Sequence, residues 1–217
     1  MSTKTKIAVI GLGNIGKVVA SNLVKSNREV ILASHKIEDA NTFAAQLGKL
    51  AKAADVKTAI TEADVVVLSV WFNAIQELLK QYAAELQGKI IIDPSNPIAP
   101  DGNGGFKKII DANESAGQIL KELQPAGAKL VKALGSLGAG SLASAAFQNP
   151  TNVLFYATDE KSITNTIEEL ITNVGFDPVN LGGIDQSIRM EVFGELHEFG
   201  ALGKPVTRAE FNQSAKS

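Results

Sequence analysis

The chain has 217 residues, 45% of them hydrophobic and 20% charged, a balance that excludes a disordered, collagen-like or coiled-coil protein. Its 21 basic and 23 acidic residues leave a net charge of −2, so we expect no nucleic-acid partner. Cysteine is absent, which excludes disulfides and cysteine-based metal sites, and no apolar run approaches the roughly 18 residues of a membrane span. We therefore expect a cytoplasmic protein without a membrane partner.

Strand and helix patterns alternate from the start of the chain. Short β-branched runs predict strands at Ile7–Ile10 and Glu29–Ala33. The apolar spacing after each run predicts helices at Asn14–Lys25 and Ile37–Leu47. A further strand is weakly indicated at Asp55–Lys57.

The clearest strand covers Asp64–Val70, whose apolar residues run without alternation, as in a parallel strand covered on both faces. The patterns that follow predict a helix, a strand, a loop, a helix and a strand, in the order Phe72–Leu86, Lys89–Asp93, Pro94–Gly105, Ser115–Leu123 and Ala128–Ala133. Because crossovers between parallel strands are right-handed, this alternation predicts an α/β fold with a doubly wound parallel sheet of the Rossmann type.

The character of the sequence changes after Gly135, where Gly, Ala and Ser dominate. Beyond this stretch the patterns predict a strand, a helix, a short strand-like element, a helix and a loose polar tail, at Asn152–Ala157, Glu160–Thr172, Phe176–Asn180, Asp185–Phe199 and Lys204–Ser217. We predict a dinucleotide-binding domain at residues 1–135 and a small C-terminal α/β extension at residues 136–217. The extension is richer in apolar residues than a small appendage can bury, which predicts a homodimer interface there.

A glycine motif joins the first predicted strand to the first predicted helix. It reads Gly11-Leu12-Gly13-Asn14-Ile15-Gly16, which is the Gly-x-Gly-x-x-Gly spacing of dinucleotide-binding loops. The first glycine allows a tight turn, the second lets the backbone approach a pyrophosphate, and the third lets helix and strand pack closely. The alternative, a glycine-rich turn without a ligand, explains neither the three positions nor the helix that follows.

The end of the second predicted strand indicates which nucleotide binds. NAD-binding proteins have an acidic residue there that bonds the ribose hydroxyls, whereas this chain has Ser34, His35 and Lys36. A hydroxyl, an imidazole and an ammonium suit a 2′-phosphate, which predicts NADP(H) as the cofactor. The alternative for His35 and Lys36 is a solvated loop.

Residues after the later strands are candidates for the nicotinamide end. Val70, Trp71 and Phe72 follow one strand and Asn96 follows the next, at the edge where ligands bind in open α/β sheets. Two other interpretations stay open: Trp71 anchors the next helix, and Asp93 braces its loop.

Side chains for acid–base catalysis are scarce. The two histidines are His35 and His197, and we expect no histidine, tyrosine or lysine at the strand ends of the cleft. His197 fits a helical pattern and is more simply explained as an exposed or core residue. We therefore predict no metal site and name no catalytic residue, because hydride transfer between two heterocycles depends on orientation and on exclusion of water.

These motifs together resemble the NADPH-dependent coenzyme F420 reductases, a family that also includes the cytoplasmic domains of STEAP-type ferric reductases. The resemblance rests on the glycine motif, Ser34–Lys36, Asp93–Pro97 and Lys132–Ala139, and it extends to the closing Gly182-Gly183 and Ile188-Arg189. It departs from the family at two points. His35 stands where those reductases have arginine, and Trp71 stands where they have proline.

The resemblance implies roles for residues along the chain. Leu12–Ile15 would contact the pyrophosphate and Ser34–Lys36 the 2′-phosphate. Val70, Phe72, Ala133 and Leu134 would face the nicotinamide. F420, or another deazaflavin or flavin, would lie over it as co-substrate, against the C-terminal part.

Two alternatives to this NADPH-dependent oxidoreductase remain open. One is a reductase of a small carbonyl or imine compound. The other is a module that binds NADPH, as a sensor or for interaction, without turnover.

Overall fold

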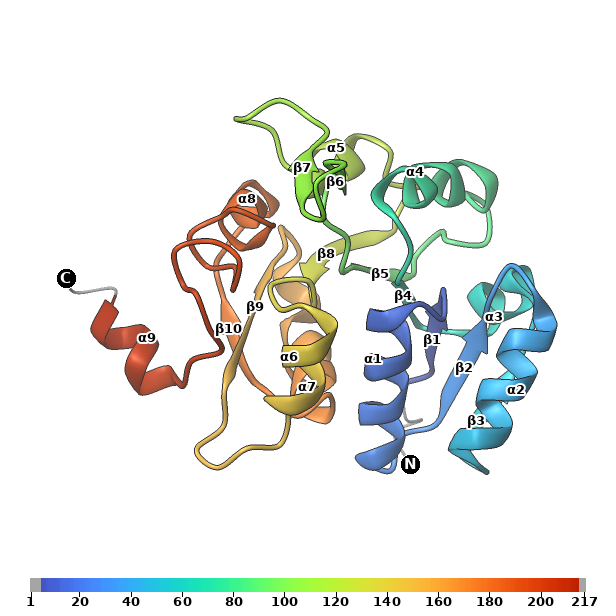
Figure 1. Ribbon diagram of the computed structural model, residues 1–217. Coiled ribbons are helices and arrows are strands. Elements are labelled where there is room, and N and C mark those ends of the chain that lie inside the picture. Colours follow the sequence, from blue (N-terminus) through green and yellow to red (C-terminus); the bar gives the residue numbers. More distant parts are fainter. Residues whose placement is uncertain (1–4, 215–217) are drawn as a thin grey trace.

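Residues 5–214 are described by a computed structural model, and eight of their strands form one sheet (Figure 1). In spatial order the strands are β10 (Asp177–Asn180), β9 (Val153–Ala157), β8 (Lys129–Ala133), β5 (Ile90–Asp93), β4 (Val65–Leu68), β1 (Ile7–Ile10), β2 (Val30–Ala33) and β3 (Ala51–Ala53). The strands from β8 to β3 are mutually parallel, whereas β9 pairs antiparallel to β8 and β10 pairs parallel to β9. This confirms the predicted Rossmann-type α/β fold with a C-terminal extension.

Helices cover both faces of the sheet, which explains why its central strands are apolar throughout. All four residues of β1 are buried, with Ile7 and Val9 in the cluster on one face and Ala8 and Ile10 in the cluster on the other. The first face is covered by α1 (Asn14–Lys25), α2 (Ile37–Leu47), α6 (Ala139–Ser144) and α7 (Thr164–Asn173). The second is covered by α3 (Val56–Glu62), α4 (Phe72–Gln81) and α5 (Ala116–Glu122).

The weakly indicated strand at Asp55–Lys57 is wrong. The edge strand β3 lies earlier, at Ala51–Ala53, and Asp55 is instead the N-cap of α3. Its Oδ1 accepts a hydrogen bond from the backbone N–H of Thr58 at 3.0 Å. An aspartate that satisfies the first turn of a helix ends the extended run before it.

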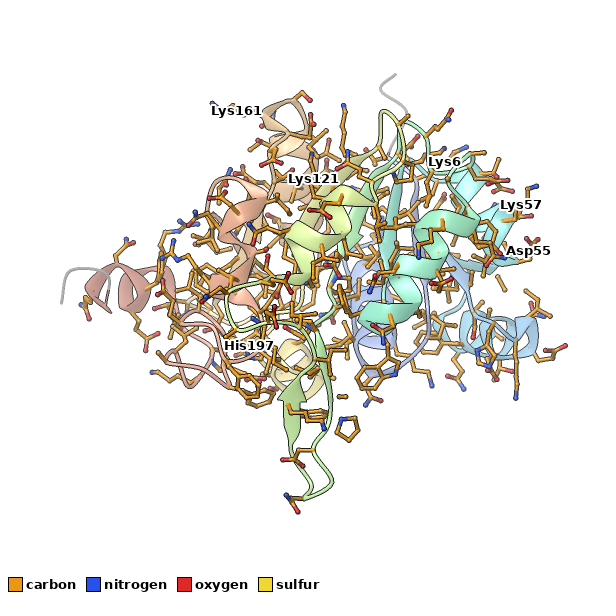
Figure 2. The ribbon with its side chains drawn as sticks, turned by 90° about the horizontal axis from the view of Figure 1, so that it is seen from above. Lys6, Asp55, Lys57, Lys121, Lys161 and His197 are labelled. Carbon is orange, nitrogen blue, oxygen red and sulfur yellow. The ribbon has the colours of Figure 1, made fainter. Side chains whose placement is uncertain are left out.

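The segment expected as a plain loop at Pro94–Gly105 contains half of a hairpin. Strand β6 (Ile98–Pro100) pairs antiparallel with β7 (Phe106–Lys108), and the two project beyond the rest of the molecule (Figure 2). The helix expected to reach Leu86 ends at Gln81, and the chain continues in turns towards β5. Neither difference moves the strands that surround the cleft.

The long helix predicted at Asp185–Phe199 is also wrong. The chain forms a 3₁₀ turn, η2 (Ile184–Gln186), and then the single turn α8 (Ser187–Met190). Glu191 leaves the helical conformation, and its carboxylate accepts hydrogen bonds from backbone N–H groups of α5. Phe193 then adopts a φ of 72°, which an α-helix cannot accommodate. A buried polar contact thus overrides the helical spacing of the apolar residues.

The tail expected to be loose is partly helical. An earlier 3₁₀ turn, η1 (Lys161–Ile163), leads into α7 and β10, and the last described element, after α8, is the helix α9 (Arg208–Ser214). Arg208 donates to both carboxylate oxygens of Asp177, each at 2.6 Å, and so ties α9 to β10. The last predicted residues, 215–217, lie outside the described part of the chain. Within residues 5–214, no helix combines the length and apolarity needed to cross a membrane.

Candidate functional site

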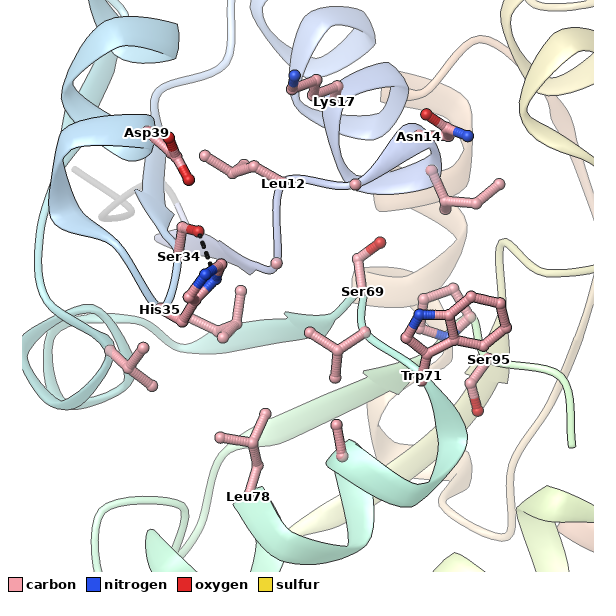
Figure 3. Close-up of a pocket in the computed structure, with 18 of the residues that line it drawn as sticks. Leu12, Asn14, Lys17, Ser34, His35, Asp39, Ser69, Trp71, Leu78 and Ser95 are labelled. Carbon is pink, nitrogen blue, oxygen red and sulfur yellow. Dashed lines mark hydrogen bonds between the residues drawn. The ribbon is translucent and has the colours of Figure 1, made fainter. Parts of the chain in front are cut away.

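A cleft of about 1150 Å³ opens at the carboxyl ends of β1, β2, β4 and β5 (Figure 3). Strand order reverses between β1 and β4, because β1 connects through α1 to β2 on one side and β4 leads to β5 on the other. Open α/β sheets bind ligands at such a switch point. The topology therefore selects this cleft as the candidate site.

The glycine motif forms the middle of the cleft, and each glycine meets a different demand. Gly11 has a φ of 94°, and a Cβ there would lie 2.3 Å from the carbonyl oxygen of Ser69. A Cβ on Gly16 would lie 2.0 Å from the carbonyl oxygen of Gly11, so that helix and loop could not pack. A Cβ on Gly13 would meet no atom of the described residues within 4 Å, because it would project into open space. Two glycines thus shape the loop and the third keeps it open.

Helix α1 begins at this opening with its backbone groups available to a ligand. Gly13 is its N-cap, and no side chain of residues 5–214 caps its first turn. The N-terminus of a helix carries a partial positive charge and unsatisfied N–H groups that favour phosphate. Leu12, Asn14 and Ile15 line the cleft beside it. This arrangement fits a pyrophosphate.

One end of the cleft lies beyond β2. Ser34 and His35 line it, with a long 3.5 Å contact between Ser34 Oγ and His35 Nδ1 (Figure 3). Lys36 is exposed, serves as the N-cap of α2, and is outside the lining. Lys17 of α1 and Asp39 of α2 line the same end, and the sequence analysis did not identify either. Lys17 directly follows the last glycine of the motif, in the first turn of α1, and this position could have predicted its place beside the cleft.

The other end lies beyond β4 and β5. Val70, Trp71 and Asn96 line it, and the indole of Trp71 is 61% exposed. Three apolar residues implied by the resemblance are buried and outside the lining, namely Phe72, Ala133 and Leu134. The side chain of Asn96 bridges two other segments, since it donates to the carbonyl of Gly135 at 3.0 Å and accepts from the N–H of Val192 at 2.7 Å.

A buried cluster of charges beneath this end was not anticipated. The ammonium of Lys132, near the end of β8, lies 2.8 Å from Asp93 Oδ2 and 3.4 Å from Glu191 Oε1. All three side chains are almost fully buried. The expectation that no lysine occurs at a strand end is therefore wrong. A lysine inside the apolar run Leu130–Ala133 was the signal that could have revealed it.

Electrostatics keep the ammonium of Lys132 charged. Burial by itself lowers the pKa of Lys132, but the attraction of Asp93 and Glu191 outweighs it, so the pKa is raised and the ammonium stays charged. Burial raises the pKa of Glu191, although Lys132 and the N–H groups of Ala116 and Gly117 oppose this shift. Groups that satisfy one another in this way support a structure and leave little capacity for ligands.

His197 is buried in the C-terminal segment and is outside the cleft lining. Its Nδ1 accepts the backbone N–H of Phe199 at 2.9 Å (His197 is labelled in Figure 2). Burial lowers its pKa to about 4. Among residues 5–214, no group of three acidic, histidine or cysteine side chains could hold a metal ion.

Comparison with known proteins gives a consistent set of relatives. Residues 6–97 match the family model described as NADP oxidoreductase, coenzyme F420-dependent. An F420-dependent NADP reductase from Methanothermobacter marburgensis is 26% identical over 193 residues, which cover 84% of this chain and 86% of the relative. One from Methanocaldococcus jannaschii is 35% identical over 104 residues, 43% of this chain and 46% of the relative.

A solved structure supports the same fold along nearly the whole chain. It is the hypothetical protein SMa0349 from Sinorhizobium meliloti, which is 28% identical and superimposes with a TM-score of 0.82. The match covers 94% of this chain and 96% of that one.

Proposed function

We propose that this chain belongs to an F420-dependent NADP reductase-like family and that it is an NADP-dependent oxidoreductase that transfers a hydride between NADP(H) and a deazaflavin of the F420 kind. The observation that carries the proposal is the cleft itself. It runs from Ser34 and His35, past the open loop at Gly13, to Trp71 and Asn96. A continuous path of this kind suits a dinucleotide with its adenine end at β2.

Different residues of the cleft bind different parts of NADP(H). Backbone N–H groups of Leu12, Gly13 and Asn14 bind the pyrophosphate at the start of α1. Ser34 and His35 bind the 2′-phosphate, with Lys36 adding positive charge from outside the lining. When bound, the nicotinamide supplies or accepts the hydride.

The chain's own part in the reaction is to orient two rings and exclude water. Val70 and the exposed indole of Trp71 present apolar surface, which suits a flat acceptor such as F420 or a flavin. Phe72, Ala133 and Leu134 are buried and are not part of this surface. A deazaflavin or flavin exchanges protons with water, so no histidine has to act as a general acid.

We further propose that residues 1–135 bind the dinucleotide and that residues 136–217 complete the acceptor site and a homodimer interface in the cytoplasm. Phe193 and Phe199 are 54% and 60% exposed, and a homodimer interface over them would remove both aromatic side chains from water. A dimer mass by light scattering at micromolar concentration supports this assembly. A monomer mass contradicts it.

An NADPH oxidation assay with F420, a flavin and a small imine in parallel tests the proposed reaction. We expect turnover with F420 or the flavin. We also expect His35→Ala and His197→Ala to lower the turnover rate by far less than the roughly 10²- to 10⁴-fold loss that follows removal of a true general acid or base. Loss of turnover in His197→Ala with NADPH affinity intact would instead favour an imine or carbonyl substrate. Tight NADPH binding without oxidation by any acceptor would favour a binding module.

A further inference from the structure

The hydroxyl group of Ser95 lies at the cleft and has no hydrogen-bond partner within the described part of the chain. It follows β5 by two residues, lines the cleft near Trp71 and is only 7% exposed (Figure 3). Its Oγ is buried and has no hydrogen-bond partner among residues 5–214. A buried hydroxyl without a partner is unfavourable, and native proteins rarely retain one without a reason.

The backbone of Ser95, in contrast, is held on both sides by the buried charges. Its N–H donates to Asp93 Oδ1 at 2.7 Å, and its carbonyl oxygen accepts from Lys132 Nζ. Lys132 and Asp93 are in turn joined at 2.8 Å. The ion pair thus fixes the peptide groups and leaves the side chain as the part that can respond to a ligand.

The cluster is anchored well beyond the cleft. Glu191, which also contacts Lys132, accepts hydrogen bonds from the N–H groups of Ala116 and Gly117 at 3.0 and 3.1 Å. The position of Ser95 therefore depends on three segments distant in sequence. Such a support fixes a ligand-binding group more precisely than a loop alone.

We propose that Ser95 Oγ hydrogen-bonds the carboxamide of the nicotinamide, and that Lys132 is the positioning residue that presents it. This inference rests on the proposed function. The order of strands along the cleft is β2, β1, β4, β5. With the adenine end at Ser34 after β2 and the pyrophosphate at Gly13 after β1, the group after β5 faces the nicotinamide end. Ser95 lines the cleft, and a rotation about its χ1 would break no hydrogen bond among residues 5–214.

Calorimetric titration of Ser95→Ala with two ligands tests this contact. NADPH contains the nicotinamide, whereas 2′,5′-ADP has only the adenine, ribose and 2′-phosphate end. We expect Ser95→Ala to weaken NADPH by about three- to tenfold, the value of one neutral hydrogen bond, and to leave 2′,5′-ADP unchanged. The matched control Ser141→Ala makes the same change on α6, outside the cleft lining, and should bind both ligands as the wild type does.

The possible failures are distinguishable. If the wild type binds neither ligand, the proposed function fails. If the wild type binds both and Ser95→Ala keeps its NADPH affinity, or loses affinity for both ligands equally, the nicotinamide contact is refuted. Quenching of Trp71, the chain's single tryptophan, gives a second measure of NADPH binding that needs no acceptor.

A double-mutant cycle tests the positioning role of Lys132. If Lys132 acts through Ser95, Lys132→Met weakens NADPH but not 2′,5′-ADP, and adding Ser95→Ala causes no further loss. Independent, additive losses would refute the positioning role. Ser95→Ala removes no protein hydrogen bond, so it keeps the contact testable even if Lys132→Met does not fold.

Discussion

The carboxyl edge of the sheet places an open region beside a closed one. After β1 and β2, the chain exposes the glycine loop at Gly13 and the side chains of Ser34 and His35 to the cleft. At the carboxyl ends of β5 and β8, Asp93 and Lys132 are each only 1% exposed and are bonded to each other. Both regions lie at the carboxyl ends of parallel strands of the same sheet, yet one presents its polar groups to the cleft and the other buries them.

The two regions differ in which of their polar groups lack a hydrogen-bond partner in the protein. In the open region, backbone N–H groups at the start of α1 have no capping side chain among the described residues. In the closed region, the charges satisfy one another, and the hydroxyl of Ser95 has no partner among residues 5–214. We infer that unsatisfied groups bind ligand and satisfied charges hold them in place.

In the open region, we expect substitution of Gly13 to cause the largest loss of NADPH affinity. Gly13→Leu should lower NADPH affinity more than about a hundredfold, because its side chain fills the pyrophosphate's space and removes several charge-assisted hydrogen bonds. Stability should change by about 1 kcal/mol or less, since a Cβ there meets open space. Calorimetry and urea unfolding measure the two effects.

Gly11→Ala is the contrasting variant for this test. Its Cβ would lie 2.3 Å from a backbone oxygen at a φ of 94°, so it should destabilise the fold itself. NADPH binding by Gly13→Leu at the wild-type level would contradict the assignment.

In the closed region the expected effect is on stability. Lys132→Met leaves two buried carboxylates without their cation and should lower the free energy of unfolding by about 3–5 kcal/mol. Lys89→Met is the matched control at the opposite edge of the sheet, where the ammonium donates to the carbonyls of Thr61 and Ala63. It should cost at most about 2 kcal/mol. If urea unfolding gives the same loss of unfolding free energy for both variants, the buried charge cluster contributes no more to stability than the lysine at the other end of the strands.

A pH titration of stability probes His197 in the same region. Its pKa is about 4 in the folded protein and about 6.5 when unfolded, so protons bind the unfolded chain more tightly. Stability is therefore fully present above pH 6.5 and is lost as pH falls towards 4, by up to about 3 kcal/mol. Urea unfolding of His197→Asn should lack this part of the pH dependence. An unchanged profile in the variant would assign the acid sensitivity to other groups.

The smallest expected effect concerns cofactor choice at the open end. The wild type should prefer NADPH over NADH by about tenfold or more, and Ser34→Asp combined with Lys36→Ala should erase the preference through charge repulsion. Lys36→Ala alone should change it less, because Lys36 is outside the lining. Equal wild-type affinity for both cofactors by calorimetry would refute the 2′-phosphate site.

The spacing of apolar residues predicted an element correctly where that element buries the same residues in the folded protein. The run Ile7–Ile10 and the helical spacing at Asn14–Lys25 and Ile37–Leu47 give the observed bounds of β1, α1 and α2. The helix expected at Asp185–Phe199 failed because Glu191 is drawn into a contact with α5, some 75 residues earlier in the chain. Periodicity cannot detect a contact of that range.

The sequence alone determined the central parallel strands and the glycine loop, because strand burial and tight backbone turns depend on residues close together in the chain. Only the tertiary structure decided which polar residues face the cleft. It buries Lys132 with Asp93, leaves the hydroxyl of Ser95 without a partner among residues 5–214 and keeps Lys36 outside the lining. The physical reason is that a buried charge is stable only beside its partners, and those partners come from β5, β8 and the segment after α8, which the fold alone brings together.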